Sequence, residues 1–229
     1  MKKGRKIGLI IILITVAIGA LFWKDMSATY LWYMAEHVGG FPEYLAVTPD
    51  TELLILPERK MTYETKSIGN LEVPMIYKKD TIVRTDSATT LVIMKQFSDS
   101  TYAVLQGTDL KESFSKEACA VMGDHRTANC LSNKVFVKKI LEAQPGGVDF
   151  HSPRETKVAV PLLLFLKKII APESTQIQPF NNGSVSGFLF HKKDGDYFAI
   201  VIANNDTIYN ILFEQVTEAE MLNILAYIK

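Results

Sequence analysis

The pattern of apolar and polar positions divides the chain into three parts. Residues 7–23 form an uncharged apolar run, residues 25–70 show no sustained period after one helical stretch, and residues 71–229 alternate between strand and helix periods. The pattern predicts a cytoplasmic tip and transmembrane signal-anchor over residues 1–24. It further predicts a juxtamembrane helix and linker over residues 25–70 and an extracytoplasmic α+β domain over residues 71–229.

The apolar run IGLIIILITVAIGALFW indicates attachment to a membrane through residues 7–23. As a helix it is about 26 Å long, close to the roughly 30 Å hydrocarbon core of a bilayer. Four basic residues precede it, namely Lys2, Lys3, Arg5 and Lys6. Because basic flanks stay in the cytoplasm, we expect a single pass through the cell (inner) membrane, with the N-terminus cytoplasmic and the C-terminal domain periplasmic or extracellular. A cleaved signal peptide is the alternative, but its best cleavage site, Ala17-Ile18-Gly19, lies inside the apolar run.

Strand periods dominate two stretches of the chain. Short runs rich in β-branched and aromatic residues, separated by polar turns, predict antiparallel hairpins over residues 71–77, 81–85, 89–97 and 101–107, and again over 184–193, 197–203 and 207–215. The run YFAIVIA at 197–203 is apolar at every position. A strand of this kind is covered on both faces, so we expect helices on each side of the sheet or a partner.

Helical periods lie between and after these strands. They predict helices over residues 25–40, 113–122, 128–143, 151–172 and 218–229. Ser152 is predicted to cap the fourth helix, with Pro153 at its first position and Glu155 three residues after the cap, and Thr217 with Glu220 forms a capping box for the last. The apolar residues 158–170 are too few, and too charged at Lys167 and Lys168, for a second membrane span, so we expect a helix buried in a core.

These elements together predict an α+β fold class: an N-terminal transmembrane helix followed by a mainly antiparallel sheet packed with helices, an αβ sandwich. Residues 113–143 supply a helical hairpin between the two groups of strands.

The charge of the chain is unevenly distributed. Of the 25 basic residues, five lie within residues 1–24, which contain no acid, so the remainder carries 20 basic against 25 acidic residues. A domain this acidic lacks the positive surface that neutralises phosphates, and we exclude nucleic acid as a partner.

Cys119 and Cys130 are the two cysteines of the chain. They flank a polar turn between two predicted helices, and an extracytoplasmic domain meets an oxidising environment, so we predict a disulfide between them. One alternative makes Cys119 a nucleophile with His125 as base and Asp124 as its orienting group, but nothing in a six-residue spacing brings these side chains together. Two thiols eleven residues apart also lack the paired spacing of a metal site.

No catalytic, cofactor-binding or metal-ligating set is predicted. We therefore expect a membrane-anchored extracytoplasmic binding or assembly module of the cell envelope that acts through protein–protein contacts with a protein partner. One alternative is a toxin-neutralising protein, an immunity protein or inhibitor, at the outer face of the membrane. The other is a hydrolase that uses residues around Asp124 and His125, with Asp149 and His151 near them in sequence.

Overall fold

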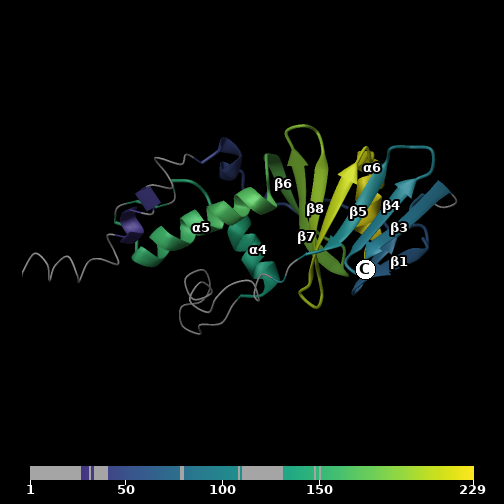
Figure 1. Ribbon diagram of the computed structural model, residues 1–229, viewed down its shortest axis with the longest axis horizontal. Helices are drawn as coiled ribbons and strands as arrows, with labels where there is room; N and C mark the ends of the chain where they lie inside the picture. The colour runs from purple at the N-terminus through teal and green to yellow at the C-terminus, as the bar shows by residue number, and fades with distance from the viewer. Residues whose placement is uncertain are drawn as a thin grey trace, which may run out of the picture.

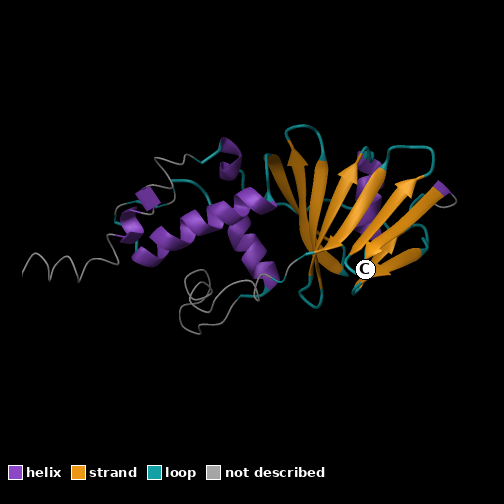
Figure 2. Cartoon of the chain, viewed as in Figure 1, coloured by secondary structure: helices purple, strands orange, loops and turns teal. Residues whose placement is uncertain are grey.

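The computed structural model describes residues 27–30, 32–33, 41–77, 80–107, 109, 131–146, 148–149 and 151–229. They are organised around one seven-stranded sheet in which all neighbouring strands are antiparallel (Figures 1 and 2). In spatial order the strands are β3 (Thr81–Ser87), β4 (Thr90–Lys95), β5 (Thr101–Gln106), β9 (Ile208–Glu214), β8 (Tyr197–Ala203), β7 (Val185–Lys192) and β6 (Ser174–Asn181). The pairing of β5 with β9 joins the two groups of strands that are separate in sequence.

One face of this sheet carries the larger hydrophobic core. It is covered by α6 (Glu218–Tyr227), which lies behind the sheet in Figure 1, and by a hairpin of β1 (Thr65–Ile68) and β2 (Leu71–Pro74). Met221 and Ile224 of α6 pack there with side chains of β4, β5, β8 and β9. The predicted capping box is confirmed, since the Thr217 hydroxyl accepts from the Glu220 N–H and the Glu220 carboxylate accepts from the Thr217 N–H.

Among the described residues, those that cover the other face of the sheet lie only at its β6–β8 end. Here α4 (Asn133–Glu142) packs Val137 and Leu141 against β6, β7 and β8, and α5 (Arg154–Ile170) packs against α4. The prediction that strand 197–203, now β8, is covered on both faces is confirmed. Phe198 and Ile200 lie in the α4 core, whereas Ala199 lies in the α6 core.

Side chains in two hairpin turns form hydrogen bonds with the backbone at the ends of neighbouring helices. Asp206, in the β8–β9 turn, accepts from the Asn133 N–H at 2.8 Å and the Lys134 N–H at 3.1 Å, the first amides of α4. Asn182, in the β6–β7 turn, donates to the carbonyls of Leu225 at 2.7 Å and Ile228 at 2.9 Å at the end of α6. Helix ends leave such groups unsatisfied, so these turns fix the helices onto the sheet.

The predicted fold class is wrong. Instead of an anchor helix leading into a sandwich, the described residues form mostly large antiparallel sheet, nine strands in all, with four short helices: η2 (Glu43–Ala46), α4, α5 and α6. A sandwich needs a helical layer across a whole face, whereas α4 and α5 reach only the β6–β8 end. No helix of the described residues is long and apolar enough to cross a membrane, and the run 7–23 lies outside those residues. What remains of the prediction is its coarser statement, an α+β organisation.

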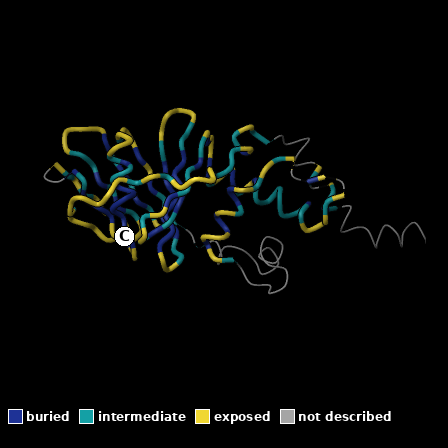
Figure 3. The backbone as a smooth tube through the Cα atoms, turned by 180° about the vertical axis from the view of Figure 1, so that it is seen from behind, coloured by how far each residue is buried: buried dark blue, intermediate teal, exposed yellow. Residues whose placement is uncertain are grey.

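Three local predictions also need correction. The α5 helix begins at Arg154 with Pro153 as its uncapped N-cap, because the Ser152 hydroxyl oxygen accepts from the Asp149 N–H instead, while the hydroxyl donates to the Asp149 carboxylate. Strand β6, which contains Pro179, was not predicted. Finally, α5 is not buried in a core: Figure 3 shows buried segments concentrated in the sheet, while most of α5 is half-buried or exposed.

The segment between η2 and β1 follows the outer edge of β6. The Asp50 N–H donates to the Ile177 carbonyl, and the Leu54 N–H donates to the Pro179 carbonyl, both at 2.8 Å. Part of the predicted linker therefore covers one edge of the sheet, and Pro179, which has no N–H to donate, is tolerated because β6 lies at that edge.

Candidate functional site

An apolar surface lies on the sheet beyond the reach of α4 and α5. We call it the open face; it consists of Ile82, Val92, Met94, Ala103, Leu105 and Leu212, on β3, β4, β5 and β9. Val92 pairs with Ala103, Ala103 pairs with Leu212, and Leu212 pairs with Phe198, so one apolar row crosses four strands. Ile82 and Leu212 are 40% and 42% exposed. Arg84, Thr101 and Asn210 pair with members of this set and border it with polar groups. Exposed apolar side chains with a polar border mark interaction sites in folded proteins.

A cavity of about 520 Å³ lies where α5 ends beside the open face. We call it the α5 groove. Its lining comes from α4, α5 and the segment after it (Val137, Leu166, Ile169, Ile170, Pro172), from β5 and its end (Leu105, Gly107), and from β7, β8 and β9 (Lys192, Phe198, Ile200, Ile208, Asn210, Leu212). The groove thus continues the apolar row of the sheet under the helix.

The α5 helix presents apolar side chains to solvent and buries lysines. Phe165 and Ile169 are each 59% exposed, whereas Lys157 and Lys167 are buried. Other apolar side chains of α5 face inward, since Leu164 is buried and Leu162, Leu163, Leu166 and Ile170 pack against α4, so the helix is apolar on more than the one stripe usual for a surface helix. Ile169 lines the α5 groove together with Leu212, so the exposed apolar surface of α5 adjoins that of the sheet at this residue.

Lys167, in the last turn of α5, connects three segments through hydrogen bonds. Its Nζ donates to the Leu45 carbonyl of η2 at 2.8 Å and to the Ala143 carbonyl, the C-cap of α4, at 2.7 Å. Burial lowers the pKa of the Lys167 amine to about 8, because the charged form is desolvated. A neutral amine still has two N–H donors for the two carbonyls. Both are committed to structural hydrogen bonds, so we assign Lys167 a structural role.

The buried amine predicts a specific dependence of stability on pH. Because the folded-state pKa of about 8 lies below the usual 10.5, unfolding takes up a proton between these values and the free energy of unfolding rises with pH across this window. We expect Lys167→Met to lose that rise, roughly 1 to 3 kcal/mol, in urea unfolding at pH 7.5 to 10.5. Lys168→Met, which removes an exposed neighbour, should keep it. Parallel pH profiles for the wild type and Lys167→Met would show that the amine keeps its ordinary pKa.

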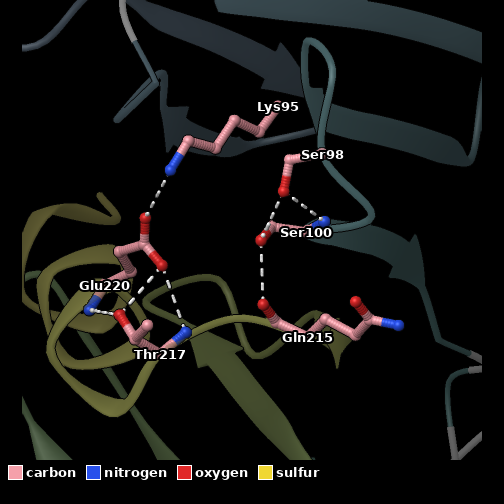
Figure 4. A network of polar contacts seen from close by, with 6 residues as sticks. All are labelled: Lys95, Ser98, Ser100, Gln215, Thr217 and Glu220. Carbon is pink, nitrogen blue, oxygen red and sulfur yellow. Dashed lines mark hydrogen bonds and ion pairs between the residues drawn. The ribbon is translucent and has the colours of Figure 1, made fainter.

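A network of polar contacts links the β4–β5 turn to the start of α6 (Figure 4). The Ser100 hydroxyl donates to the Gln215 carbonyl at 2.8 Å, and Lys95 Nζ lies 3.7 Å from the Glu220 carboxylate. A serine hydroxyl that donates to a backbone carbonyl is not poised for proton removal by a base, and the Lys95 ammonium already faces a carboxylate. This network fixes the turn to the helix and offers no activated nucleophile.

A second cavity, of about 490 Å³, lies between α4 and the β6 edge. Its apolar floor includes Phe180 and Phe188, and Lys134, Lys138, Glu142 and Asp50 supply charges of both signs. Lys138 already lies 3.6 Å from the Glu142 carboxylate. The mixed lining selects no ligand by charge.

Some of the candidate residues from the sequence lie within the described part of the structure and others lie outside it. Cys119, Cys130, Asp124 and His125 lie outside the described residues, so the disulfide, nucleophile and hydrolase hypotheses stay predictions. Asp149 and His151 lie just before α5, which begins at Arg154. Asp149 accepts from the Ser152 hydroxyl at 2.9 Å, and this hydrogen bond holds the pKa of its carboxyl below the usual range. Within the described part of the chain, no group of three or more His, Cys, Asp or Glu could hold a metal ion.

The residues of the open face and groove were not recognised in the sequence. Leu105 and Leu212 belong to predicted strands, but the sequence does not say which strand faces stay uncovered. One signal was present: residues 158–166 are apolar around the whole helix circumference, which predicts more apolar surface than a single core contact can bury.

Comparisons with known protein families, with curated proteins and with solved structures found no match to this chain. The site must therefore be interpreted from its own geometry.

Proposed function

We propose that the protein is a binding module of the cell envelope that acts through protein–protein contacts at the open face. The observation that carries this proposal is the apolar row from Val92 to Phe198, which Ile169 of α5 adjoins at the α5 groove. Exposing such a surface to water costs free energy. Burying it against a partner contributes about 25 cal/mol of transfer free energy for each Å² of apolar area.

The location of the module is part of the proposal. The apolar run 7–23 and the basic residues before it support attachment to the cell membrane, with the domain outside the cytoplasm. In that position the open face is available to other envelope proteins.

Substitution within the open face tests the proposal. Leu212→Asp places a carboxylate in the middle of the apolar row, and because Leu212 is partly exposed, the domain should still fold. We expect an affinity-tagged full chain, purified from the envelope, to recover a stoichiometric protein partner, and Leu212→Asp to reduce the recovery at least tenfold.

The matched control is Ile55→Asp, which changes an apolar side chain that is 90% exposed and lies outside the open face. It should recover the partner as the wild type does. Absence of a partner from the wild type, or equal recovery with Leu212→Asp, contradicts the proposal. The toxin-neutralising alternative predicts the same kind of surface, and the identity of the recovered partner distinguishes the two.

A further inference from the structure

We propose that the α5 groove binds a single-chain anionic amphiphile, such as a fatty acid or another lipid fragment with one acidic head group. This inference goes beyond the protein contact proposed above and does not rest on it, because it concerns a small ligand inside the groove.

The walls of the groove fit a hydrocarbon chain. Ten of the thirteen lining residues are apolar, and the other three are Gly107, Lys192 and Asn210. Leu166, Ile169 and Ile170 of α5 face a floor formed by the sheet, so a chain placed between them contacts apolar atoms on both sides. The volume of about 520 Å³ lies within the roughly 300 to 1,000 Å³ typical of small-molecule sites.

The charge of the groove selects the head group. Lys192 is the single charged residue in the lining, which contains no Asp or Glu. Its Nζ lies 5.8 Å from the centre of the Phe198 ring, which places the ammonium against the apolar floor. None of the ion pairs among the described residues involves Lys192. A carboxylate or phosphate could pair with this ammonium while its chain lies along the apolar walls.

The same lining disfavours polar ligands. A nucleotide or a sugar presents many hydrogen-bonding groups, and each one buried without a partner costs binding energy. Apart from backbone groups, Lys192 and the Asn210 amide are the polar groups that the lining offers. One acidic group at the end of a hydrocarbon chain is the chemistry that this set can satisfy.

Photo-labelling of the full chain tests the inference, with dodecanoic acid that carries a diazirine near its methyl end as the probe. We expect saturable labelling of peptides that contain Leu105, Leu166, Ile169 or Leu212, and competition by unlabelled dodecanoate. Within the capacity of the groove, each methylene added to the competitor should lower its half-maximal concentration about three- to fourfold.

Two lysine variants separate charge pairing from simple partition into apolar surface. Lys192→Met should raise the half-maximal concentration of the acid about tenfold and leave labelling by the uncharged dodecanol analogue unchanged, which also shows that the groove is intact. Lys193→Met, which removes the exposed lysine next to it, should behave as the wild type. Labels confined to other peptides, or equal labelling of all three proteins by the acid, would overturn the inference.

The two proposals fail separately. Leu212 belongs to both the open face and the groove, so Leu212→Asp does not separate the two proposals. The lysine variants do, because they leave the open face unchanged and alter only the recognition of a small acid. If the groove binds no amphiphile, the ligand proposal is contradicted and the protein contact is not. If the groove is labelled in a chain that recovers no protein, the protein contact is contradicted and the ligand proposal is not.

Discussion

Replacing Asn182 with aspartate is expected to destabilise the protein by about 2 to 4 kcal/mol, although the two side chains have nearly the same shape. The Asn182 amide nitrogen donates to the carbonyls of Leu225 at 2.7 Å and Ile228 at 2.9 Å. Its amide oxygen accepts from the N–H groups of Ser184 at 2.9 Å and Val185 at 3.0 Å. One side chain thus closes the β6–β7 turn and the end of α6 together.

An aspartate keeps only the accepting half of this arrangement. Its second carboxylate oxygen would face two carbonyl oxygens at hydrogen-bond distance, and its charge would lie at the negative end of α6. For a chain of 229 residues the expected loss corresponds to a fall in Tm of about 5 to 15 °C, measurable by thermal unfolding of the purified full chain.

Asn181→Asp is the matched control for this substitution. The Asn181 side chain only accepts, from the Gly183 N–H at 2.8 Å, and a carboxylate can do the same. We expect a change below about 0.5 kcal/mol. Equal stability of Asn182→Asp and Asn181→Asp would show that the end of α6 is not held by the Asn182 amide.

Replacing Gly187 with alanine is expected to cost at least about 3 kcal/mol. Gly187 lies in β7, where a Cβ would overlap the Ile200 carbonyl oxygen and come within 2.7 Å of the Phe180 ring. Phe180 pairs with Gly187 across β6 and β7, and its ring occupies the space that the missing side chain leaves. Because the Ile200 oxygen belongs to the backbone of β8, the clash is relieved only if the strands separate.

The expected loss of stability is opposite to the effect of intrinsic strand preference. Glycine within a strand is normally less favourable than alanine by roughly 0.5 to 1 kcal/mol. Urea unfolding of Gly187→Ala should show the loss. Ser186→Ala changes the neighbouring half-buried residue and should stay within about 1 kcal/mol of the wild type. An alanine variant as stable as the wild type would mean that Phe180 and β8 can move aside at little cost.

Local signals in the sequence predicted several individual elements, although the predicted fold class was wrong. The capping box at Thr217 and the polar turns between strands depend on neighbouring residues, and the structure contains them. Strand β6 was missed because Pro179 and several polar residues hide its alternation, and because the chain that covers its edge lies far away in sequence. Sequence predicts Ser152 as a helix cap because it does not show that the Asp149 N–H occupies the acceptor of the Ser152 hydroxyl.

The candidate site was beyond local prediction for a physical reason. Lys192, Leu212 and Ile169 lie on three elements, and only the packing of the sheet against α5 brings them into one groove. The burial of Lys167 was also hidden, because its partners are backbone carbonyls of η2 and the α4 C-cap, and any residue supplies these. Helix periodicity placed Lys167 among apolar neighbours but gave no reason to bury it.

The most direct test of the binding module is a photo-reactive amino acid placed at Leu212 in the full chain, with the same amino acid at Ile55 for comparison. If the open face binds a protein in the envelope, irradiation of intact cells should give a crosslinked adduct of defined mass from position 212 and none from position 55. Adducts from both positions or from neither would contradict a contact at the open face.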